Sequence, residues 1–403
     1  MTCNIGIYNL HMKAMGGGEK LTLVLAEHLS LRHNVFLFSE DDLDVPSLEQ
    51  FFGVDLSRVS FSRLNGPGLV SKIIARVCGR NRRTFTPHHF LQLKNLNLDL
   101  FINISYASTL PSPSERGIFL CMFPHQTSHR NKIKFRTAAA DWFEKRMNGS
   151  AVSKSLDSYP LIIAISRYSA DWVRRFWGRN SEIVYPPCDD MGPLAAKRKM
   201  ILHVGRFISD GADGRHHKNQ RFLIETFKRL TDLHSAGWEL HLVGSVTPDD
   251  RSTSFTETLI EAGRGFPVFF HFNAPREEMR TLYQTAAIYW HATGYGSDVE
   301  QHPAKQEHFG MSTVEAMSAG AVPVVYSSGG QKEIVTDGVN GFLWNDVEEL
   351  MSRTRDLAND QVLLCELSSR AVNSSKQFGR TAFAARIDEL MSGLNVEPRS
   401  EVS

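Results

Sequence analysis

Short apolar runs, rich in β-branched and aromatic side chains, alternate with segments of helical period through the first half of the chain. These runs begin near positions 5, 34, 100, 118, 161 and 182. Between several of them the apolar positions repeat with helical spacing, as in 20–30 and 169–177. Strands that alternate with helices form parallel sheets, because each return connection has to cross the sheet. The first half therefore predicts an α/β domain.

The second half repeats this alternation after a change in composition. A polar stretch containing proline and glycine, DDMGPLAAKRK, follows Cys188, and the apolar runs then resume as MILHVG, WELHLVG, PVFFHF, IYWHA and VPVVYS. We therefore expect two α/β domains, residues 1–190 and 191–376, each with a doubly wound parallel sheet, facing a cleft. A last helical segment within 377–394 is expected to cross back to the first domain, with a flexible tail at 395–403.

Length and composition agree with a soluble globular protein of more than one domain. The chain has 403 residues, of which 42% are hydrophobic and 22% are charged, and its formal net charge of +1 provides no general attraction to nucleic acid. The five cysteines are scattered without a Cys-x-x-Cys spacing, which argues against disulfides and structural zinc. No apolar run approaches the roughly 18 residues of a spanning helix. Because the N-terminus begins directly as a strand, we expect a cytoplasmic protein that is neither secreted nor transmembrane.

Two cations flank a polar loop in the second half. Arg206 follows the buried strand MILHVG, and Lys218 lies at the other end of the loop ISDGADGRHHKN. Open α/β sheets bind ligands at the carboxyl ends of their strands, so these two side chains are placed to converge on an anionic group. The alternative is that both are ordinary solvated loop cations.

The stretch EHFGMSTVEAMSAG contains two acids, Glu307 and Glu315, on either side of the start of a predicted helix. A helix N-terminus preceded by glycine is an anion-binding element, because its first amides are unpaired and its dipole is positive there. The two acids are suited to accept hydrogen bonds from sugar hydroxyls. The alternative for Glu315 is a capping box with Ser312, in which the acid only satisfies a backbone amide.

These features together resemble a known family. The segment from Glu307 to Glu315, followed by AMSAGAVPVV and GGQKEIV, is similar to the E-x7-E signature of retaining glycosyltransferases of family 4, which have the GT-B fold of two Rossmann-like domains. The segments GRF, HKNQ, LVGS, HATGYG and NGFLW occur in the family's order around it. The resemblance extends from about Leu161 to Trp344 and is thin over the rest of the first domain.

The resemblance implies a role for individual residues. Arg206 and Lys218 fall where the family holds the donor diphosphate, Glu315 where it binds the ribose hydroxyls, and Glu307 beside the transferred sugar. Backbone groups near the sugar and diphosphate complete the donor-binding set: Gly205, Phe309, Gly310 and Met311. Ala316, Ala319 and Gly320 are interpreted as packing of the helix on the sheet.

The first domain carries a glycine-rich stretch, Gly16 to Gly18, between its first strand and first helix. A dinucleotide fingerprint would require glycine in place of Leu21, and a P-loop would require Gly-Lys-Ser/Thr, so neither motif is present. By resemblance, Gly17 and Gly18 contact the donor diphosphate.

A histidine, His125, follows the strand IFLCMF and is assigned by the same resemblance to the sugar. With His129 it also has a spacing compatible with zinc on a helix, although no third ligand is evident and polar packing is the simpler alternative.

The sequence also bears on metal use. Asp42-Leu43-Asp44 spells the D-x-D of metal-dependent glycosyltransferases of another fold, but it lies in the acidic run SEDDLD, where a solvated loop is expected. The resemblance implies no metal and no cofactor, with Arg206, Lys218 and the helix dipole in place of a cation.

Basic residues gather in two segments, 58–94 and 129–136, with apolar residues between them. Such segments bind anionic membrane surfaces, and the alternative is a solvated helix face. If these segments bind a membrane, the acceptor is lipid-linked and the protein is peripheral on the inner face of the membrane.

We therefore predict a retaining glycosyltransferase that moves a sugar from a nucleoside-diphosphate donor to a glycan hydroxyl. GDP-mannose is our assignment, from resemblance to mannosyltransferases with the EHFG form of the motif, since no side-chain motif distinguishes one base from another. The alternatives are a nucleotide-sugar epimerase of the same architecture, a catalytically silent binding subunit and, less favoured, a nicotinamide dehydrogenase. Nucleic acid is not an expected partner, and acceptor, linkage and oligomeric state are not encoded in any motif that we recognise.

Overall fold

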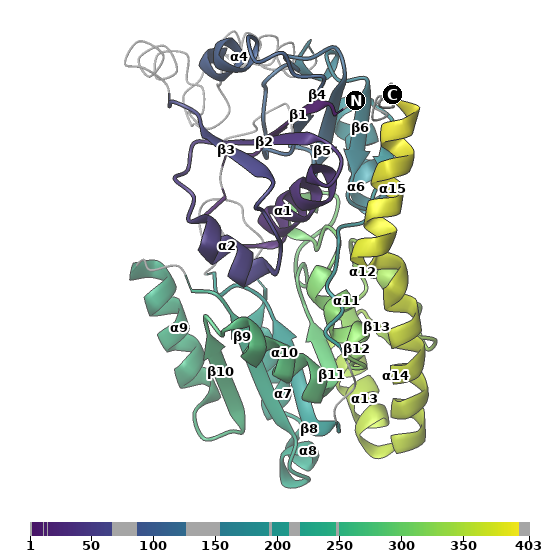
Figure 1. Ribbon diagram of the computed structural model, residues 1–403. Helices are drawn as coiled ribbons and strands as arrows, with labels where there is room; N and C mark the ends of the chain where they lie inside the picture. The colour runs from purple at the N-terminus through teal and green to yellow at the C-terminus, as the bar shows by residue number, and fades with distance from the viewer. Residues whose placement is uncertain are drawn as a thin grey trace, which may run out of the picture. The chain divides into compact units, whose positions relative to one another are not determined.

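The computed structural model describes residues 2–394 except positions 11, 14, 67–86, 126–153, 193–195, 209–217 and 247–249. The chain divides into two compact units (Figure 1). The first unit comprises Met1–Tyr185 together with Phe383–Ser403, and the second comprises Pro186–Ala382.

The first unit is built on a seven-stranded sheet with the order β3-β2-β1-β4-β5-β6-β7, in which all paired neighbours are parallel. Its strands are β1 (Asn4–Tyr8), β2 (Asn34–Ser39), β3 (Val59–Arg63), β4 (Leu100–Asn103), β5 (Gly117–Cys121), β6 (Leu161–Ala164) and β7 (Glu182–Ile183). The central strands are buried along nearly their whole length, as parallel strands covered on both faces must be, and this is why each appears in the sequence as a continuous apolar run.

Five helices accompany this sheet in the described part of the first unit: α1 (Gly17–Ser30), α2 (Val45–Phe52), α4 (Pro87–Leu93), α6 (Arg167–Trp177) and the last helix, α15 (Arg380–Gly393). The helix α15 buries Phe383, Ile387 and Met391 at helical spacing. Its polar side binds the same unit, because His28 Nε2 lies 2.7 Å from Asp388 Oδ1. A segment from the end of the described chain thus completes the first unit.

The second unit has a six-stranded parallel sheet with the order β10-β9-β8-β11-β12-β13. The strands are β8 (Arg198–Val204), β9 (Glu239–Gly244), β10 (Val268–Phe272), β11 (Ala286–His291), β12 (Val322–Tyr326) and β13 (Phe342–Trp344). Its described helices of more than one turn are α7 (Gln220–Lys228), α8 (Thr231–Ser235), α9 (Asp250–Gly263), α10 (Arg276–Thr285), α11 (Met311–Ser318), α12 (Gln331–Ile334), α13 (Val347–Asn359) and α14 (Gln361–Ser375). In Figure 1, α9 lies beside β10 at one edge of this sheet and α13 lies near β13 at the other.

The prediction of two α/β units with parallel sheets is confirmed. The sequence reading missed two edge strands, β3 and β13. In β3 most side chains are exposed or half-buried and polar residues alternate with apolar ones, so the run does not look like a buried parallel strand. The strand β13 has only three residues, which is too short for a period to be recognised.

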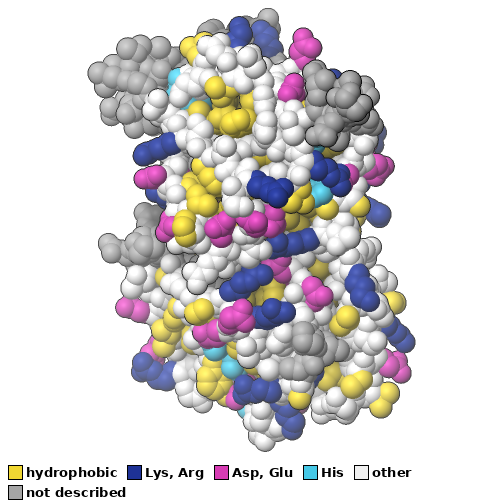
Figure 2. Space-filling view, viewed as in Figure 1, with side chains coloured by type: hydrophobic (Ala, Val, Ile, Leu, Met, Phe, Trp, Pro, Cys, Tyr) yellow, Lys and Arg dark blue, Asp and Glu magenta, His cyan; other side chains and the backbone are white. Residues whose placement is uncertain are grey.

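Among the described residues, no helix combines the length and the apolarity that crossing a bilayer requires. Figure 2 shows that, on the face drawn, the basic side chains of the described residues are interspersed with acidic ones. The basic segment 129–136 and the central part of 58–94 lie outside the described residues.

Candidate active site

The second sheet has a topological switch point between β8 and β11. From β8 the chain proceeds outward through β9 to β10, and it then returns to β11 on the other side of β8. Because helical connections leave on opposite sides of such a point, the carboxyl ends of the two strands are where ligands bind in open α/β sheets. Arg206 follows the end of β8, and His291 is the last residue of β11.

Glu307 is held at this point by two side chains. Its Oε2 atom lies 2.5 Å from Lys218 Nζ and 2.9 Å from His291 Nε2. The Lys218 and Glu307 side chains are only 16% and 14% exposed, and His291 is fully buried. An ammonium group and an imidazole therefore fix one oxygen of a largely buried carboxylate.

The imidazole of His291 is neutral at pH 7. Burial lowers its pKa below the usual value, and the neighbouring Glu307 carboxylate raises it by less. Its Nε2 atom therefore carries the proton that is donated to Glu307. A second buried histidine, His203 on β8, has a ring centroid 6.3 Å away, and burial lowers the pKa of His203 to about 3. These two histidines therefore add no positive charge beside the pair formed by Lys218 and Glu307.

Lys218 is followed by two residues, Asn219 and Gln220, whose side chains hydrogen-bond to neighbouring loops. Asn219 has a positive φ of 54° and donates from Nδ2 to the carbonyls of Ala292, at 2.7 Å, and Tyr295, at 3.1 Å. Gln220 donates from Nε2 to the carbonyl of Arg206 at 3.0 Å. These two side-chain amides join the start of α7 to the loops after β8 and β11. Asparagine suits position 219 because it tolerates the left-handed conformation that the turn requires.

Glycine is required at position 205 by close packing. A Cβ atom there would lie 2.7 Å from Cγ of Lys218 and 3.1 Å from Nε2 of His203. The lysine stem therefore lies directly against the backbone at the end of β8, which directs its ammonium group toward Glu307.

Arg206 differs from Lys218 in having no partner for its side chain among the residues that the structure describes. No described residue forms a hydrogen bond or ion pair with its side chain, which is half-buried. Its planar guanidinium is thus available to bind an oxyanion with two parallel hydrogen bonds.

The helix α11 begins directly after Glu307-His308-Phe309. Its N-cap is Gly310, at a φ of 119°, and no side chain caps it. A Cβ at position 310 would lie 2.7 Å from the Gln331 side chain, so both the backbone conformation and the space require glycine. The uncapped amides of this helix end form an anion-binding element next to Glu307.

The capping-box alternative for Glu315 is wrong. With Gly310 as the N-cap, Ser312 lies inside the helix and Glu315 lies more than one turn along it. The Glu315 carboxylate instead accepts a hydrogen bond of 3.1 Å from the Tyr283 hydroxyl, and Ser312 Oγ lies 2.8 Å from the Tyr289 hydroxyl. Glu315 is therefore a half-buried acid positioned by a tyrosine, and it is not a helix cap.

A glycine turn supports the loop of Glu307 from behind. The amide of Gly330 donates to the carbonyl of Glu307 at 2.8 Å. A Cβ at Gly329, which has a φ of 59°, would lie 2.1 Å from that carbonyl oxygen, and one at Gly330 would lie 2.4 Å from Cα of Phe309. The turn at 328–330 fits the backbone of residues 307–309 so closely that it sets their position.

Other predicted residues of this segment contribute through the backbone. The side chain of Phe309 is 2% exposed and packs edge-on against Phe378 with ring centroids 5.4 Å apart, so only its main chain can face a ligand. Ala316 and Ala319 are fully buried, in agreement with helix-on-sheet packing.

The remaining predicted residues lie in the first unit. Gly17 and Gly18 open α1, whose N-cap amide at Gly16 donates to Glu19 Oε2 at 2.7 Å. A Cβ at Gly18 would lie 2.7 Å from Sδ of Met122, which explains the glycine by packing.

His125 lies against Trp177, whose Nε1 donates to the His125 carbonyl at 3.2 Å. The second histidine of the spacing considered for zinc, His129, lies outside the described residues. Asp44 of the D-x-D sequence caps α2 by accepting from Ser47, which agrees with the interpretation of this run as an ordinary loop.

Sequence reasoning missed His291 and Tyr283. His291 is the penultimate residue of the run IYWHA, and a histidine at the carboxyl end of an apolar strand was a usable signal, because it marks the same edge of the sheet as Arg206. No pattern in the sequence indicates Tyr283, which lies inside α10.

Comparison with known proteins shows which proteins the part of the chain around this site is similar to. Residues 191–378 match the family model described as glycosyl transferases group 1. A Dictyostelium discoideum protein named GDP-Man:Man(3)GlcNAc(2)-PP-Dol alpha-1,2-mannosyltransferase is 26% identical over 246 residues, 56% of this chain and 45% of that protein. The Mus musculus protein of the same name is 28% identical over 261 residues, 58% of this chain and 49% of that protein. The match thus spans about half the length of these relatives.

Solved structures agree over almost the whole chain. Anabaena Alr3699/HepE in complex with UDP has a TM-score of 0.67 at 18% identity, covering 98% of this chain and 100% of that chain. A glycosyltransferase from Rickettsia africae has a TM-score of 0.68 at 14% identity, covering 98% of this chain and 99% of that chain. At these identities the likeness establishes the fold. The second unit thus matches the glycosyl transferases group 1 model, and the whole chain shares the fold of these solved structures, with two parallel-sheet units.

Proposed function

We propose that the protein is a retaining glycosyltransferase that transfers mannose from GDP-mannose to a hydroxyl of a lipid-linked or polysaccharide glycan. The observation that carries this proposal is the position of Glu307, held by Lys218 and His291 immediately before the uncapped start of α11. The names of the Dictyostelium and mouse relatives, which specify GDP-mannose and a dolichol-linked glycan for those proteins, support the choice of donor and acceptor.

The donor's anionic and hydroxyl groups match separate parts of the second unit. We assign the diphosphate to Arg206, Lys218 and the first amides of α11, since all of these donate hydrogen bonds to oxyanions. Glu315 is assigned to the ribose hydroxyls and Glu307 to the hydroxyls of the transferred sugar. The contact of 2.5 Å between Lys218 and Glu307 offsets the repulsion that an unpaired acid would exert on the diphosphate.

The proposed reaction uses no protein nucleophile and no metal. The acceptor oxygen attacks the anomeric carbon from the face that the diphosphate leaves, so one C–O bond forms as the other breaks and the configuration is retained. The acceptor proton passes to the departing phosphate oxygen. Arg206, Lys218 and the dipole of α11 stabilise the charge that develops there, and groups of this kind typically each contribute about 100- to 1000-fold in rate.

Donor recognition is tested by calorimetric binding of GDP, UDP, dTDP and ADP without metal. We expect GDP to bind to the wild type and to lose affinity in Glu315→Ala. The matched control is Glu366→Ala, which removes an exposed helical acid that pairs with Arg370 one turn away. Equal affinities in wild type and Glu315→Ala would show that the ribose site is misplaced, and tight binding of another nucleotide would replace GDP as the donor base.

Catalysis is tested separately with purified protein, GDP-mannose and a lipid-linked glycan. We expect a mannosylated product whose new linkage is α, and Lys218→Ala is expected to lower turnover more than it lowers nucleotide affinity. Conversion of the hexose nucleotide without transfer would identify the protein as an epimerase. Nucleotide binding with neither reaction would identify a silent binding subunit.

We further propose that the basic segments 58–94 and 129–136 bind an anionic membrane surface on its cytoplasmic side. In the described part of the first segment, Arg58, Arg63 and Lys94 are exposed. Cosedimentation with vesicles that contain phosphatidylserine is expected at low salt and should be lost at high salt, because screening shortens the range of the attraction. Equal association with neutral vesicles would contradict this proposal.

A further inference from the structure

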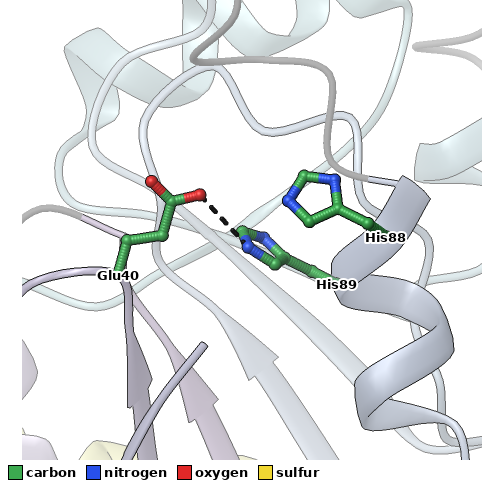
Figure 3. Close-up of side chains that lie close together, drawn as sticks. All are labelled: Glu40, His88 and His89. Carbon is green, nitrogen blue, oxygen red and sulfur yellow. Dashed lines mark ion pairs between the residues drawn. The ribbon is translucent and has the colours of Figure 1, made fainter. Parts of the chain in front are cut away.

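A separate cluster of ionisable side chains lies in the first unit, where β1 and β2 end. Glu40 follows β2, and His88 and His89 lie in the first turn of α4. Figure 3 shows the Glu40 carboxylate reaching toward the ring of His89, with the ring of His88 beside it. One ligand atom from each of the three side chains lies within 4.8 Å of those of the other two. Residues distant in the sequence thus bring two imidazoles and a carboxylate together.

His89 is buried between two oxygen atoms. Its Nδ1 atom lies 2.9 Å from the Tyr8 hydroxyl, and its Nε2 atom lies 3.1 Å from Glu40 Oε1. The contact with Glu40 is close but does not have the alignment of a hydrogen bond. The ring of His89 also interacts with the backbone of Asn65, but no well-aligned hydrogen bond from the described residues reaches Nε2.

The side chain of His88 lacks hydrogen-bond partners to a greater extent than that of His89. Both of its ring nitrogens are buried, and neither has a hydrogen-bond partner in the part of the chain that the structure describes. Its ring centroid lies 4.1 Å from that of His89. Buried polar groups are normally paired, because removing them from water without a partner costs free energy. Unpaired imidazole nitrogens beside a carboxylate are a feature that a bound cation would explain.

We propose that Glu40, His88 and His89 bind a divalent cation of the zinc class. Two imidazoles and one carboxylate are a donor set that suits zinc, whereas magnesium and calcium favour oxygen ligands. The Tyr8 hydroxyl is the outer partner that orients the ring of His89, as found for metal-bound histidines in general. Three protein ligands leave a fourth position for water.

The distances permit this arrangement with small adjustments. Tetrahedral bonds of about 2.0 to 2.2 Å place ligand atoms about 3.4 Å apart, close to the 3.1 Å between His89 Nε2 and Glu40 Oε1. The Glu40 side chain is 30% exposed and can rotate to close the wider separations. The cation would join α4 to the end of β2, and it is distinct from the metal-free chemistry proposed for the second unit.

A second histidine cluster supplies a matched control. In the second unit, His241 Nδ1 lies 3.0 Å from His271 Nε2, and the outer nitrogens lie 3.1 Å from Glu239 and 2.8 Å from Glu278. All four ring nitrogens of His241 and His271 have hydrogen-bond partners, so no cation is needed to satisfy them. Substitution of His271 therefore removes an imidazole beside a carboxylate without affecting the proposed site.

The experiment is a zinc titration of the full-length protein after chelation and desalting, followed by calorimetry and by competition with a chromophoric chelator. We expect one equivalent of zinc to bind with a Kd of about 1 μM or tighter. His88→Gln and Glu40→Gln should each weaken this affinity by at least about tenfold, and Tyr8→Phe by about 10- to 100-fold. His271→Gln should leave it unchanged. Cobalt should give the visible absorption bands of a four-coordinate site in the wild type only.

Thermal unfolding in chelator identifies variants that fail to fold. Glu40→Gln, at a half-exposed position, keeps the test valid if His88→Gln is unstable. Absence of zinc binding to the wild type at about 100 μM would overturn the proposal. Equal affinities in the wild type, Glu40→Gln and His88→Gln would also overturn it, because the zinc would then occupy another site.

Discussion

The role of His291 can be tested by His291→Phe, which keeps a ring of similar size and removes the hydrogen bond of 2.9 Å to Glu307. A hydrogen bond to a charged group contributes about 1.5 to 3 kcal/mol. With about 1.4 kcal/mol for each factor of ten, its loss corresponds to about 10- to 150-fold. We expect a decrease of this size in kcat/KM for transfer, since Glu307 would be positioned by Lys218 alone.

The assay separates positioning from general damage. Initial rates are measured with GDP-mannose and acceptor, and GDP binding is measured by calorimetry. Because GDP lacks the sugar that Glu307 is proposed to face, its Kd should remain within about twofold. The control is His241→Phe, another buried histidine beside a carboxylate of the same sheet. A kcat/KM within twofold of the wild type would refute the reasoning, and so would an equal loss of GDP affinity.

Two further predictions concern the loop of Glu307 and the pH dependence of stability. Gly329→Ala should lower the transfer rate by at least about tenfold, because its Cβ would lie 2.1 Å from the Glu307 carbonyl oxygen. The control Gly338→Ala has a similar φ of 70° but open space around it, and it should show only a stability loss of about 1 kcal/mol. Similar transfer rates for the two variants would contradict this prediction. Burial lowers the pKa of His291 and brings that of His203 to about 3 from the usual 6.5. The unfolded chain takes up protons near pH 6.5 and the native second unit does not, so stability is complete above that pH and falls below it, by up to about 1.4 kcal/mol per pH unit per histidine. Urea unfolding from about pH 7.5 to about pH 4.5 measures this loss, and a flat profile would exclude it.

Much of the fold was accessible from the sequence, because parallel strands are buried on both faces and therefore appear as apolar runs. Edge strands lack this property, which is why β3 was missed. Arg206 and Glu307 were recognised by their position at the ends of predicted strands and helices. The contact between Lys218 and Glu307 was not predicted from the sequence, because it joins residues 89 positions apart and depends on β8 lying next to β11.

The capping-box alternative for Glu315 shows a second limit of prediction from sequence. A capping box is defined by spacing alone, and Ser312-x-x-Glu315 has the correct spacing. The helix nevertheless begins at Met311, because Gly310 adopts a φ of 119° that residues with side chains rarely adopt. The backbone conformation of one glycine therefore decided the role of an acid five residues later.

The contribution of α15 to the first unit affects how the chain folds during synthesis. Ile387 and Met391 cover apolar surface formed by segments that are made first, such as Leu25 of α1 and Ile102 of β4. That surface stays uncovered while the entire second unit is translated. The unit that is synthesised first is therefore completed last, and in the interval its exposed apolar face is open to aggregation or to chaperone binding.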